Sequence, residues 1–289
     1  MTIITRFAPS PTGRLHLGHA LSAMLSHDRA RLADGQFLLR IDDIDGARSR
    51  PEFVTAAMED LHWFGLGWDG EPVYQSQRLG LYRDALVRLS ARDLIYPCFC
   101  TRAGIEAEVA ASASAPHGEF GPVYPGTCRH RGNEERLARA HEPHCWRLDM
   151  AKAVALSGPL FWEDERAGII PATPEAAGDV VLARKDAPAS YHLASTIDDA
   201  LMGITHVIRG RDLFASTHIH RLLQSLLDLP VPLYHHHPLI VDAGGKRLAK
   251  RDRATELAQL REQGLDGWAL VDDLRRGVVP AGYSLSDSA

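Results

Sequence analysis

The chain has 289 residues, of which 45% are hydrophobic and 24% are charged, and its formal net charge is −5. These values are typical of a folded globular protein with room for two domains, and they exclude a disordered or strongly basic chain. The sequence shows neither a signal peptide nor an apolar run of about eighteen residues, so we expect a cytoplasmic protein without a membrane partner. Four cysteines in a chain of this length do not make a disulfide scaffold.

The first stretch of the chain combines a strand, a tight loop and a helix. The β-branched run of residues 2–5 predicts a strand, and the apolar spacing of residues 20–32 predicts a helix. The loop between them, residues 6–19, reads RFAPSPTGRLHLGH and is shaped by its prolines and glycines. Because the first turn of a helix presents unpaired N–H groups and the positive end of the helix dipole, this loop is suited to bind an anion.

Two histidines at the end of this loop are candidate catalytic residues. His16 and His19 are three residues apart, so in a helical first turn they share one face. Gly18, which lies between them, lets the backbone come close to a ligand. Two imidazoles at a helix N-terminus can stabilise a phosphate that gains charge in a transition state. A His-x-x-His pair is more often structural, and here the loop context favours function.

The next elements are a strand and two helices. Residues 36–41 predict a strand that ends in the carboxylate cluster of residues 42–45, a position where open α/β sheets bind ligands; a solvated turn is the alternative. Residues 51–64 and 77–94 predict helices. The sequence GLGWDG at 65–70 matches the dinucleotide pattern G-x-G-x-x-G, but a helix precedes it. We therefore expect these glycines to end that helix and not to bind NAD.

A change in composition indicates a smaller domain inserted into the first one. Residues 97–188 are richer in Pro, Gly, Ala and Ser, whereas the composition of residues 191–199 is again like that of the first part of the chain. The insertion contains ten lysines and arginines and thirteen acidic residues. No domain-wide basic field is therefore present, and an RNA partner has to be argued from motifs.

The insertion contains a candidate metal site. Cys98, Cys100 and Cys128 can supply three thiolates, which suit zinc in a closed structural site. Reduced, buried thiols are the alternative, because Cys-x-Cys is not the common Cys-x-x-Cys zinc pattern. Cys145 and His130 are possible further ligands.

The last third of the chain holds a second candidate phosphate-binding segment. Lys246 and Lys250 lie four residues apart on a loop that begins with two glycines, so they can neutralise the β- and γ-phosphates of a nucleotide. A charged surface loop is the alternative. The run His235 to His237 is expected to be structural, because consecutive residues of a strand point to opposite faces and cannot easily share one ion.

These motifs together resemble the two signatures of class I aminoacyl-tRNA synthetases. HLGH at 16–19 is similar to the "HIGH" signature, RFAPSPTG is the version found in glutamyl-type enzymes, and KRLAK at 246–250 resembles a degenerate "KMSKS". The resemblance implies an α/β fold with a Rossmann-like, parallel nucleotide-binding sheet. Its catalytic domain would comprise residues 1–96 and 189–289, with a smaller α/β domain inserted at 97–188 that contacts an RNA stem.

The resemblance also implies roles for individual residues. The implied ATP-binding residues are His16, Gly18, His19, Lys246 and Lys250, of which His16, His19 and Lys250 would be catalytic, with Mg²⁺ accompanying the ATP. The implied glutamate-binding residues are Arg6, Phe7, Ala8, Pro9, Ser10, Asp42, Tyr191 and Arg209. A planar guanidinium such as that of Arg209 suits a carboxylate. The chain departs from the family at Asp42, where Glu is usual, at Arg211, also usually Glu, and at Ala249, where Ser is usual.

The short glutamyl-type relatives hold a structural zinc ion, and the resemblance extends to that site. It implies Zn²⁺ bound by three thiolates and one phenolate. These ligands would be Cys98, Cys100, Tyr124 and Cys128. The fourth position stays open among Tyr124, His130 and Cys145.

The length of the chain after Lys250 bears on its substrate. Thirty-nine residues follow, with helices expected at 256–263 and 268–275. Because an independent domain usually needs about 50 residues, we expect no anticodon-binding domain. The chain thus resembles truncated glutamyl-type paralogues, which are ligases that activate L-glutamate with ATP and transfer it to queuosine in the anticodon of tRNA(Asp). We expect it to act as a monomer.

Three other functions remain open at this point. The same pocket would permit a truncated synthetase that charges the 3′ end of tRNA(Glu). A small nucleotidyltransferase can also use a His-x-Gly-His loop, although it would not need a glutamate pocket. A non-catalytic tRNA-binding module would keep the fold and lose the chemistry, and fold resemblance alone does not choose among these functions.

Overall fold

The computed structural model describes residues 2–111, 117–118, 121–246, 248 and 256–287. The helices in this part of the chain are α1 (Leu17–Arg31), α2 (Pro51–Trp63), α3 (Leu79–Ala91), α4 (Arg102–Ala111), α5 (Asn133–Ala138), α6 (Met150–Ser157), α7 (Tyr191–Leu201), α8 (Ser216–Leu226), α9 (Leu257–Glu262) and α10 (Gly267–Arg275). Short 3₁₀ turns are η1 (Gln75–Gln77), η2 (Pro174–Ala177) and η3 (Arg211–Leu213).

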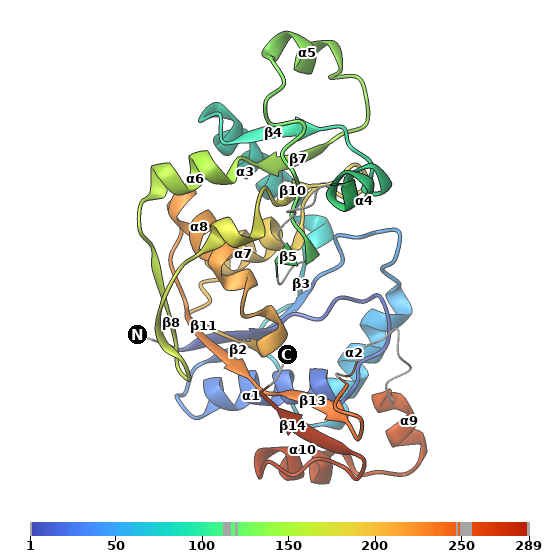
Figure 1. Ribbon diagram of the computed structural model, residues 1–289. Coiled ribbons are helices and arrows are strands. Elements are labelled where there is room, and N and C mark those ends of the chain that lie inside the picture. The colour runs from blue at the N-terminus through green and yellow to red at the C-terminus, as the bar shows by residue number, and fades with distance from the viewer. Residues whose placement is uncertain (1, 112–116, 119–120, 247, 249–255, 288–289) are drawn as a thin grey trace.

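The strands alternate with these helices along much of the chain (Figure 1). They are β1 (Ile4–Phe7), β2 (Gln36–Ile41), β3 (Val73–Tyr74), β4 (Ile95–Cys98), β5 (His117–Gly118), β6 (Gly121–Pro122), β7 (Cys145–Leu148), β8 (Phe161–Asp164), β9 (Gly168–Pro171), β10 (Val181–Ala183), β11 (His206–Gly210), β12 (Leu233–His237), β13 (Leu239–Asp242) and β14 (Tyr283–Ser286).

The predicted parallel nucleotide-binding sheet is confirmed. Strand β1 pairs in parallel with β2 and β2 with β3, while β11 pairs in parallel with β12 and β12 with β8. The two groups of strands adjoin where the Thr205 N–H, just ahead of β11, donates a 2.9 Å hydrogen bond to the Ile4 carbonyl. Because parallel strands end at the same edge of a sheet, the segments after β1, β2 and β11 come together there.

The first two elements are shifted relative to the sequence prediction. Strand β1 lies two residues further along than expected, because its pairing with β2 continues to Phe7, opposite Leu39. Helix α1 begins at Leu17, three residues earlier than expected, because His16 caps its first turn. The sequence did not predict this start, since His is not among the usual N-cap residues.

The elements up to residue 94 follow the prediction more closely. Strand β2 is as predicted, and α2 ends one residue early. Helix α3 is shorter than the predicted range 77–94, because Asp93 has a φ of 52° and continues no helix. Gly65 ends α2 with a φ of 68°, and a Cβ added there would lie 2.4 Å from the Trp268 ring. This glycine therefore turns the chain and packs closely, as expected.

The strands of the range 97–188 belong to three sheets, of which β5 and β6 form a small antiparallel pair. Strands β4, β7 and β10 form an antiparallel sheet at one end of the molecule (Figure 1). The β8–β9 hairpin lies in the same range, but Asp164 of β8 pairs with Tyr234 of β12, so this hairpin extends the nucleotide-binding sheet. The division into 1–96, 97–188 and 189–289 remains a prediction, and the hairpin belongs to the sheet of the last segment.

The terminal helices pack beneath the first loop. Helices α9 and α10 lie within one residue of their predicted ranges, and Leu257 and Val271 join the buried core that α1 and α2 form. The Leu257 N–H also donates a 2.9 Å hydrogen bond to the carbonyl of Leu15, directly before His16. The described part of the chain contains no helix long and apolar enough to cross a bilayer.

Candidate active site

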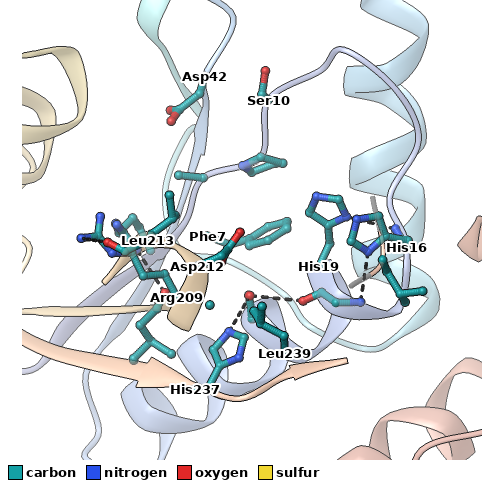
Figure 2. A pocket seen from close by; sticks show the side chains of 18 of the residues that line it. Phe7, Ser10, His16, His19, Asp42, Arg209, Asp212, Leu213, His237 and Leu239 are labelled. Atoms are coloured by element: carbon teal, nitrogen blue, oxygen red, sulfur yellow. Dashed lines mark hydrogen bonds between the residues drawn. The ribbon is translucent and has the colours of Figure 1, made fainter. Parts of the chain in front are cut away.

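A pocket of about 330 Å³ lies at the carboxyl ends of β1, β2 and β11 (Figure 2). Every residue that the resemblance assigns to glutamate lines it: Arg6, Phe7, Ala8, Pro9, Ser10, Asp42, Tyr191 and Arg209. So do three of the residues assigned to ATP, namely His16, Gly18 and His19. In Figure 2, Arg209 and the two histidines lie on opposite sides of the pocket. The roles themselves stay predictions, but the structure brings these residues together.

The two histidines are held in one arrangement by backbone N–H groups. The Gly18 N–H donates to His16 Nδ1 at 3.2 Å, and the His16 N–H donates to His19 Nδ1 at 3.1 Å. Because a backbone N–H only donates, both Nδ1 atoms are unprotonated, and each neutral ring carries its proton on Nε2. The ring centroids are 3.8 Å apart. The loop therefore presents two N–H donors at a helix N-terminus.

Gly18 has a steric reason to be glycine. A Cβ added at this position would lie 3.1 Å from the His16 ring. A larger residue would therefore require that imidazole to shift by a few tenths of an ångström. The sequence predicted that Gly18 lets the backbone approach a ligand. The close contact with the His16 ring is a second reason for a glycine here.

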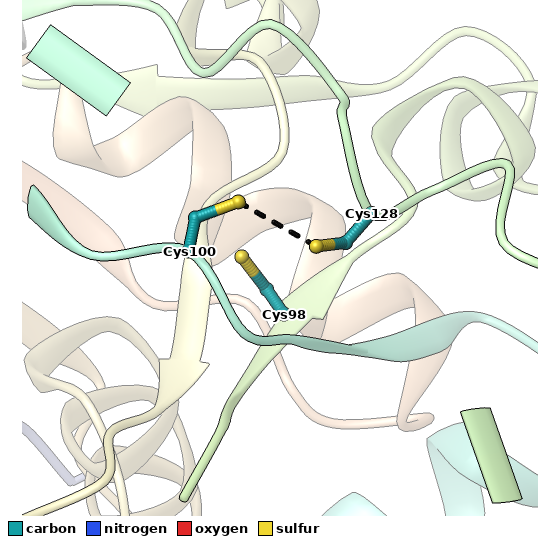
Figure 3. Close-up of side chains that lie close together, drawn as sticks. All are labelled: Cys98, Cys100 and Cys128. Carbon is teal, nitrogen blue, oxygen red and sulfur yellow. Dashed lines mark hydrogen bonds between the residues drawn. The ribbon is translucent and has the colours of Figure 1, made fainter. Parts of the chain in front are cut away.

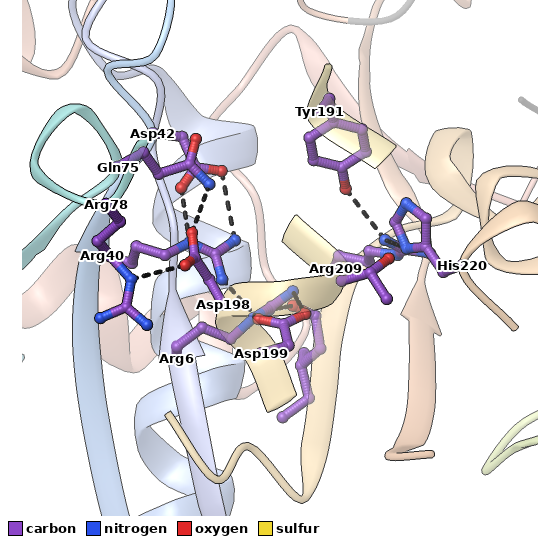
Figure 4. Close-up of polar contacts among 12 residues, drawn as sticks. Arg6, Arg40, Asp42, Gln75, Arg78, Tyr191, Asp198, Asp199, Arg209 and His220 are labelled. Carbon is purple, nitrogen blue, oxygen red and sulfur yellow. Dashed lines mark hydrogen bonds and ion pairs between the residues drawn. The ribbon is translucent and has the colours of Figure 1, made fainter. Parts of the chain in front are cut away.

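Arg209 is buried beneath the pocket and is fully engaged (Figure 4). Its Nη1 donates to the Tyr191 hydroxyl at 3.0 Å, its Nη2 to Thr217 Oγ1 at 2.7 Å, and its Nε to His236 Nε2 at 3.1 Å. The guanidinium is thus locked in one orientation. The hydrogen bond to Tyr191 joins the two residues, Tyr191 and Arg209, that were predicted to line the same pocket.

A carboxylate sets the orientation of Arg209 through a histidine. His236 Nδ1 lies 2.8 Å from Asp164 Oδ2, a carboxylate that can only accept. The ring therefore donates from Nδ1 and uses Nε2 as the acceptor for Arg209. Burial lowers the pKa of His236 to about 4, so the ring is neutral at pH 7. Sequence reasoning missed Asp164 and His236, because they come from strands β8 and β12.

A buried charge cluster underlies the glutamate side of the pocket (Figure 4). Asp199 Oδ1 accepts from Arg6 Nε at 2.9 Å and from Arg40 Nη1 at 2.6 Å. Burial raises the pKa of Asp199, but the two guanidiniums outweigh it and hold that pKa below its usual value. Arg6, which was predicted to contact glutamate, lines the pocket with its guanidinium bound to Asp199.

Asp42, the residue directly after β2, is bound by Arg40 near the end of that strand. Arg40 Nε donates to Asp42 Oδ1 at 2.6 Å and Nη2 to Oδ2 at 3.3 Å. Burial raises the pKa of Asp42 in spite of this pairing. The Asp42 carboxylate is thus paired with Arg40 while the residue still lines the pocket.

A second acidic residue of α7 supports the neighbouring segment. Asp198 is fully buried and accepts from Gln75 Nε2 at 2.9 Å, Arg78 Nε at 2.7 Å and the Tyr82 hydroxyl at 2.7 Å. Adjacent carboxylates of one helix thus anchor different parts of the fold. The signal in the sequence was a pair of acidic residues directly after the apolar Ile197 of an amphipathic helix.

The three consecutive histidines face different partners, as predicted. His235 bonds the exposed Glu165, whereas His236 bonds the buried Asp164. His237 Nδ1 lies 2.8 Å from the Pro238 carbonyl, so it donates there, and Nε2 accepts from the Ser22 hydroxyl at 2.7 Å. His237 and Ser22 line the pocket, and sequence reasoning missed both.

The low pKa values of the buried His236 and His237 predict that the stability of the protein depends on pH. Burial lowers the pKa of His236 and His237 to about 4, against 6.5 for the ordinary group. The unfolded chain therefore binds protons first, and the free energy of unfolding should fall as pH drops from about 6.5 to about 4, by about 2 kcal/mol per histidine at pH 5. Asp60, whose pKa burial raises to about 6, acts in the opposite sense.

Urea unfolding at pH 7.0, 6.0 and 5.0 measures this dependence. His237→Gln should flatten the curve, since Gln does not titrate in this range. His62→Gln, at an exposed position, should leave it unchanged. A His237→Gln curve as steep as that of the unmodified chain would contradict the prediction.

The second candidate phosphate-binding segment is described only in part. The Lys246 N–H donates to Asp242 Oδ1 at 3.0 Å, and Gly245 has a φ of 76°, which defines a tight turn after β13. Lys246 is exposed and is not among the residues that line the pocket. Lys250 and Ala249 lie outside the described residues, so the role predicted for Lys250 stays a prediction.

Three cysteines of the insertion converge (Figure 3). The Sγ atoms of Cys98, Cys100 and Cys128 lie within 4.8 Å of one another, and those of Cys100 and Cys128 are 3.5 Å apart. The Cys145 thiol, beside Cys98, outweighs burial and lowers the pKa of Cys98 to about 4. The pKa of Cys128 is also lowered, because its hydrogen bonds outweigh burial. This cluster can hold a metal ion.

The hydroxyl of Tyr124 completes the cluster. Its Oη lies 3.4 Å from Cys98 Sγ and 3.5 Å from Cys100 Sγ. A tetrahedral ion with Zn–S bonds of about 2.3 Å and a Zn–O bond of about 2.0 Å places sulfur and oxygen about 3.5 Å apart, so the donor set fits zinc. Neither His130 nor Cys145 joins the described group of ligand atoms, and the Cys145 thiol instead donates to the Cys98 carbonyl at 3.5 Å.

Known proteins match this chain over most of its length. The profile described as "tRNA synthetases class I (E and Q), catalytic domain" matches residues 2–284. The chain is 51% identical to the glutamyl-Q tRNA(Asp) synthetase of Rhodobacter capsulatus over 95% of this chain and 99% of the relative. It is 42% identical to the protein of that name from Deinococcus radiodurans, over 98% and 91% of the two chains.

The fold has solved counterparts as well. The glutamate-tRNA synthetase of Elizabethkingia anophelis superposes with a TM-score of 0.75 at 31% identity, over 88% of this chain and 53% of that chain. The match thus spans about half of the longer synthetase and most of this protein. On the profile, the relatives and the site together, the chain belongs to the class I tRNA synthetases of the glutamyl and glutaminyl group, in the family of the glutamyl-Q tRNA(Asp) synthetases.

Proposed function

We propose that this protein activates L-glutamate with ATP to glutamyl-adenylate and transfers the glutamyl group to queuosine in the anticodon of tRNA(Asp). The observation that carries the proposal is one pocket lined by cationic and polar residues on one side and by the two signature histidines on the other. The name of the relatives, glutamyl-Q tRNA(Asp) synthetase, indicates the acceptor that we propose.

The pocket can orient an amino acid with two carboxylates. The guanidinium of Arg209, whose N–H groups are held by Tyr191, His236 and other protein partners, attracts one carboxylate of glutamate through its fixed positive charge. The carboxylate of Asp42, held by Arg40, provides a negative charge for the substrate ammonium group, directly or through a water molecule. Ser10, Phe7, Ala8 and Pro9 line the pocket between these charged groups.

The chemistry follows from where charge develops. The free carboxylate of glutamate attacks the α-phosphate of ATP, and pyrophosphate leaves. His16 and His19 donate from Nε2 to the phosphate oxygens as they gain charge, and Lys250, with Lys246, neutralises the leaving pyrophosphate. Mg²⁺, which accompanies ATP, supplies further charge neutralisation when it is bound. A hydroxyl of the queuosine ring then attacks the adenylate carbonyl, and AMP leaves.

The experiment that tests this function compares two tRNA pools. Labelled glutamate is offered with ATP to tRNA from cells that make queuosine and to tRNA from cells that do not. We expect label only in the first pool, confined to tRNA(Asp), and retained after the 3′ nucleotide is removed. Equal label in both pools that disappears with the 3′ end would show a truncated enzyme that charges tRNA(Glu).

A separate measurement addresses loss of chemistry. Glutamate-dependent exchange of ATP with pyrophosphate reports adenylate formation without any RNA. We expect this exchange in the purified chain. Its absence would favour the non-catalytic tRNA-binding module, since such a module keeps the fold alone.

We further propose that Cys98, Cys100, Cys128 and Tyr124 hold a structural zinc ion. The Tyr124 hydroxyl lies at the separation from two thiols that a tetrahedral ion imposes, and the three thiols lie within 4.8 Å of one another. Such an ion joins the end of β4 to the loop that carries Cys128 and stabilises the insertion. The insertion in turn would contact the stem beside the anticodon loop.

Removing the phenolate should weaken this site. Loss of an outer-shell partner lowers metal affinity by about 10- to 100-fold. Tyr124→Phe removes one of the four ligands themselves, so we expect zinc affinity to fall by more than that. Pyrophosphate exchange should remain, since the pocket lies in the other domain. Chelator competition on the purified full-length chain measures the affinity.

Two variants serve as controls for Tyr124→Phe. Tyr96→Phe removes a buried hydroxyl that bonds Asp179 and no thiol, and Cys145→Ser removes the thiol that lies outside the ligand group. Both should keep one zinc ion per chain. Unchanged affinity in Tyr124→Phe together with loss in Cys145→Ser would assign the fourth position to Cys145.

A further inference from the structure

The proposed zinc site carries an unbalanced charge. Three thiolates and one phenolate bring four negative charges to an ion with two positive charges, which leaves a net charge of −2. Cys98, Cys128 and Tyr124 are buried. Because a buried charge is costly unless a partner compensates it, the site requires a cation close by.

Arg147 lies where such a cation is needed. It sits on β7, and the register of β4 and β7 places Cys98 opposite Cys145, two residues from Arg147 on the same face of the sheet. The centre of its guanidinium is 3.8 Å from the centroid of the Tyr124 ring. This is well within the distance at which a cation interacts with an aromatic ring.

Arg147 has no other charge partner in the described part of the chain. It is 9% exposed, and its Nη1 donates at 2.7 Å to a backbone carbonyl, that of Asp179. The Asp179 carboxylate instead pairs with Arg129 and accepts from Tyr96 and the Met150 N–H. Arg147 Nε is buried and, among the described residues, makes no hydrogen bond of ordinary geometry. Arginine is rarely buried without a carboxylate partner.

We propose that Arg147 is the counter-ion of the metal centre and a positioning residue for its phenolate ligand. Stacked on the Tyr124 ring and close to Cys98, the guanidinium compensates the negative charge of the loaded site. It offsets one of the two excess negative charges, and its contact with the ring holds Tyr124 beside the thiols. This inference rests on the proposed zinc site.

The test measures Zn²⁺ affinity of the full-length chain by competition with a chromophoric chelator. For Arg147→Met, which keeps much of the side-chain volume and removes the charge, we expect affinity to fall by about 10- to 100-fold. Arg147→Lys, which keeps the charge without the planar group, should lie between the two. Arg139→Met is the matched control, because Arg139 stacks on Phe99 at 4.3 Å, a ring with no ligand atom, and should leave affinity unchanged.

A double-mutant cycle separates a counter-ion from a general packing role. If Arg147 acts through the phenolate, Arg147→Met should weaken binding less in the Tyr124→Phe background than in the unmodified chain. Glutamate-dependent pyrophosphate exchange verifies folding in each variant, since Arg147 lies outside the pocket. Should Arg147→Met fail this check, Arg147→Lys alone decides the question.

Weaker binding in Arg147→Met and Arg147→Lys, with Arg139→Met unchanged, supports the inference. Equal affinity in the Arg147 variants and the unmodified chain, or an equal loss in Arg139→Met, overturns it. A chain that binds no zinc at all overturns the zinc proposal itself, and that result is distinguishable because it appears without any substitution.

Discussion

Replacing His19 by Asn is expected to slow glutamate-dependent pyrophosphate exchange by about 10²- to 10³-fold, and His16→Asn should have a similar effect. Both imidazoles accept backbone N–H groups on Nδ1, so each proton on Nε2 is placed to meet a phosphate oxygen. Asparagine retains an acceptor near the Nδ1 position and removes the Nε2 donor. The helix cap should therefore survive while the donor is lost, since Asn is itself a good N-cap residue.

The kinetic pattern separates catalysis from binding. If the donors act on charge that develops in the transition state, kcat falls and the KM for ATP changes little. The double variant should lose less than the product of the two single effects, because the histidines act on one group. His27→Asn, in the same helix but outside the pocket, is the control and should retain full exchange. A rise in KM with unchanged kcat would sink the proposed role.

Replacing Asp199 by Asn is expected to destabilise the protein by about 3–5 kcal/mol, because removing one partner leaves buried charge uncompensated. Asp199 accepts from both Arg6 and Arg40, and all three residues are buried. In the variant, Asp42 remains as the carboxylate that Arg40 contacts. We also expect the KM for glutamate to rise, since Arg6 and Asp42 line the pocket.

A surface pair of the same chemistry provides the control for Asp199→Asn. Asp186 bonds Arg184 at 3.1 Å, but both side chains are largely exposed, so Asp186→Asn should cost no more than about 1 kcal/mol. Urea unfolding measures stability, and pyrophosphate exchange at varied glutamate measures KM. Because the lowered pKa of Asp199 gives stability that is lost as pH falls through that pKa, the difference between Asp199→Asn and the unmodified chain should shrink in acid. A constant difference down to low pH would argue against the ion pairs as its cause.

Much of the site that sequence reasoning found from the residues alone is local in the chain. The loop from Arg6 to His19 carries its own strand, turn and helix start, so a short segment is sufficient to predict a phosphate-binding geometry. The same holds for the thiols of Cys98 and Cys100, which are two residues apart. In each case the chemistry depends on neighbours in sequence.

The part that it missed depends on distant segments. Asp164 and His236 lie on different strands and become neighbours because β8 pairs with β12. Asp199 meets Arg6 and Arg40 only when α7 packs beside the nucleotide-binding sheet. As single residues in a sequence, these groups look like ordinary surface charges. Burial is what gives them their effect, and burial is a property of the folded chain.

The fold class, the family and most residues of the pocket could be predicted without a structure, because the two signature motifs are encoded in contiguous residues and their resemblance to a known family implies the rest. The tertiary structure alone decided which groups compensate one another. It placed Arg40 on Asp42, a histidine between Asp164 and Arg209, and Arg147 on the ring of Tyr124. The physical reason is that electrostatic strength depends on distance and burial, and both are set when elements far apart in the chain pack together.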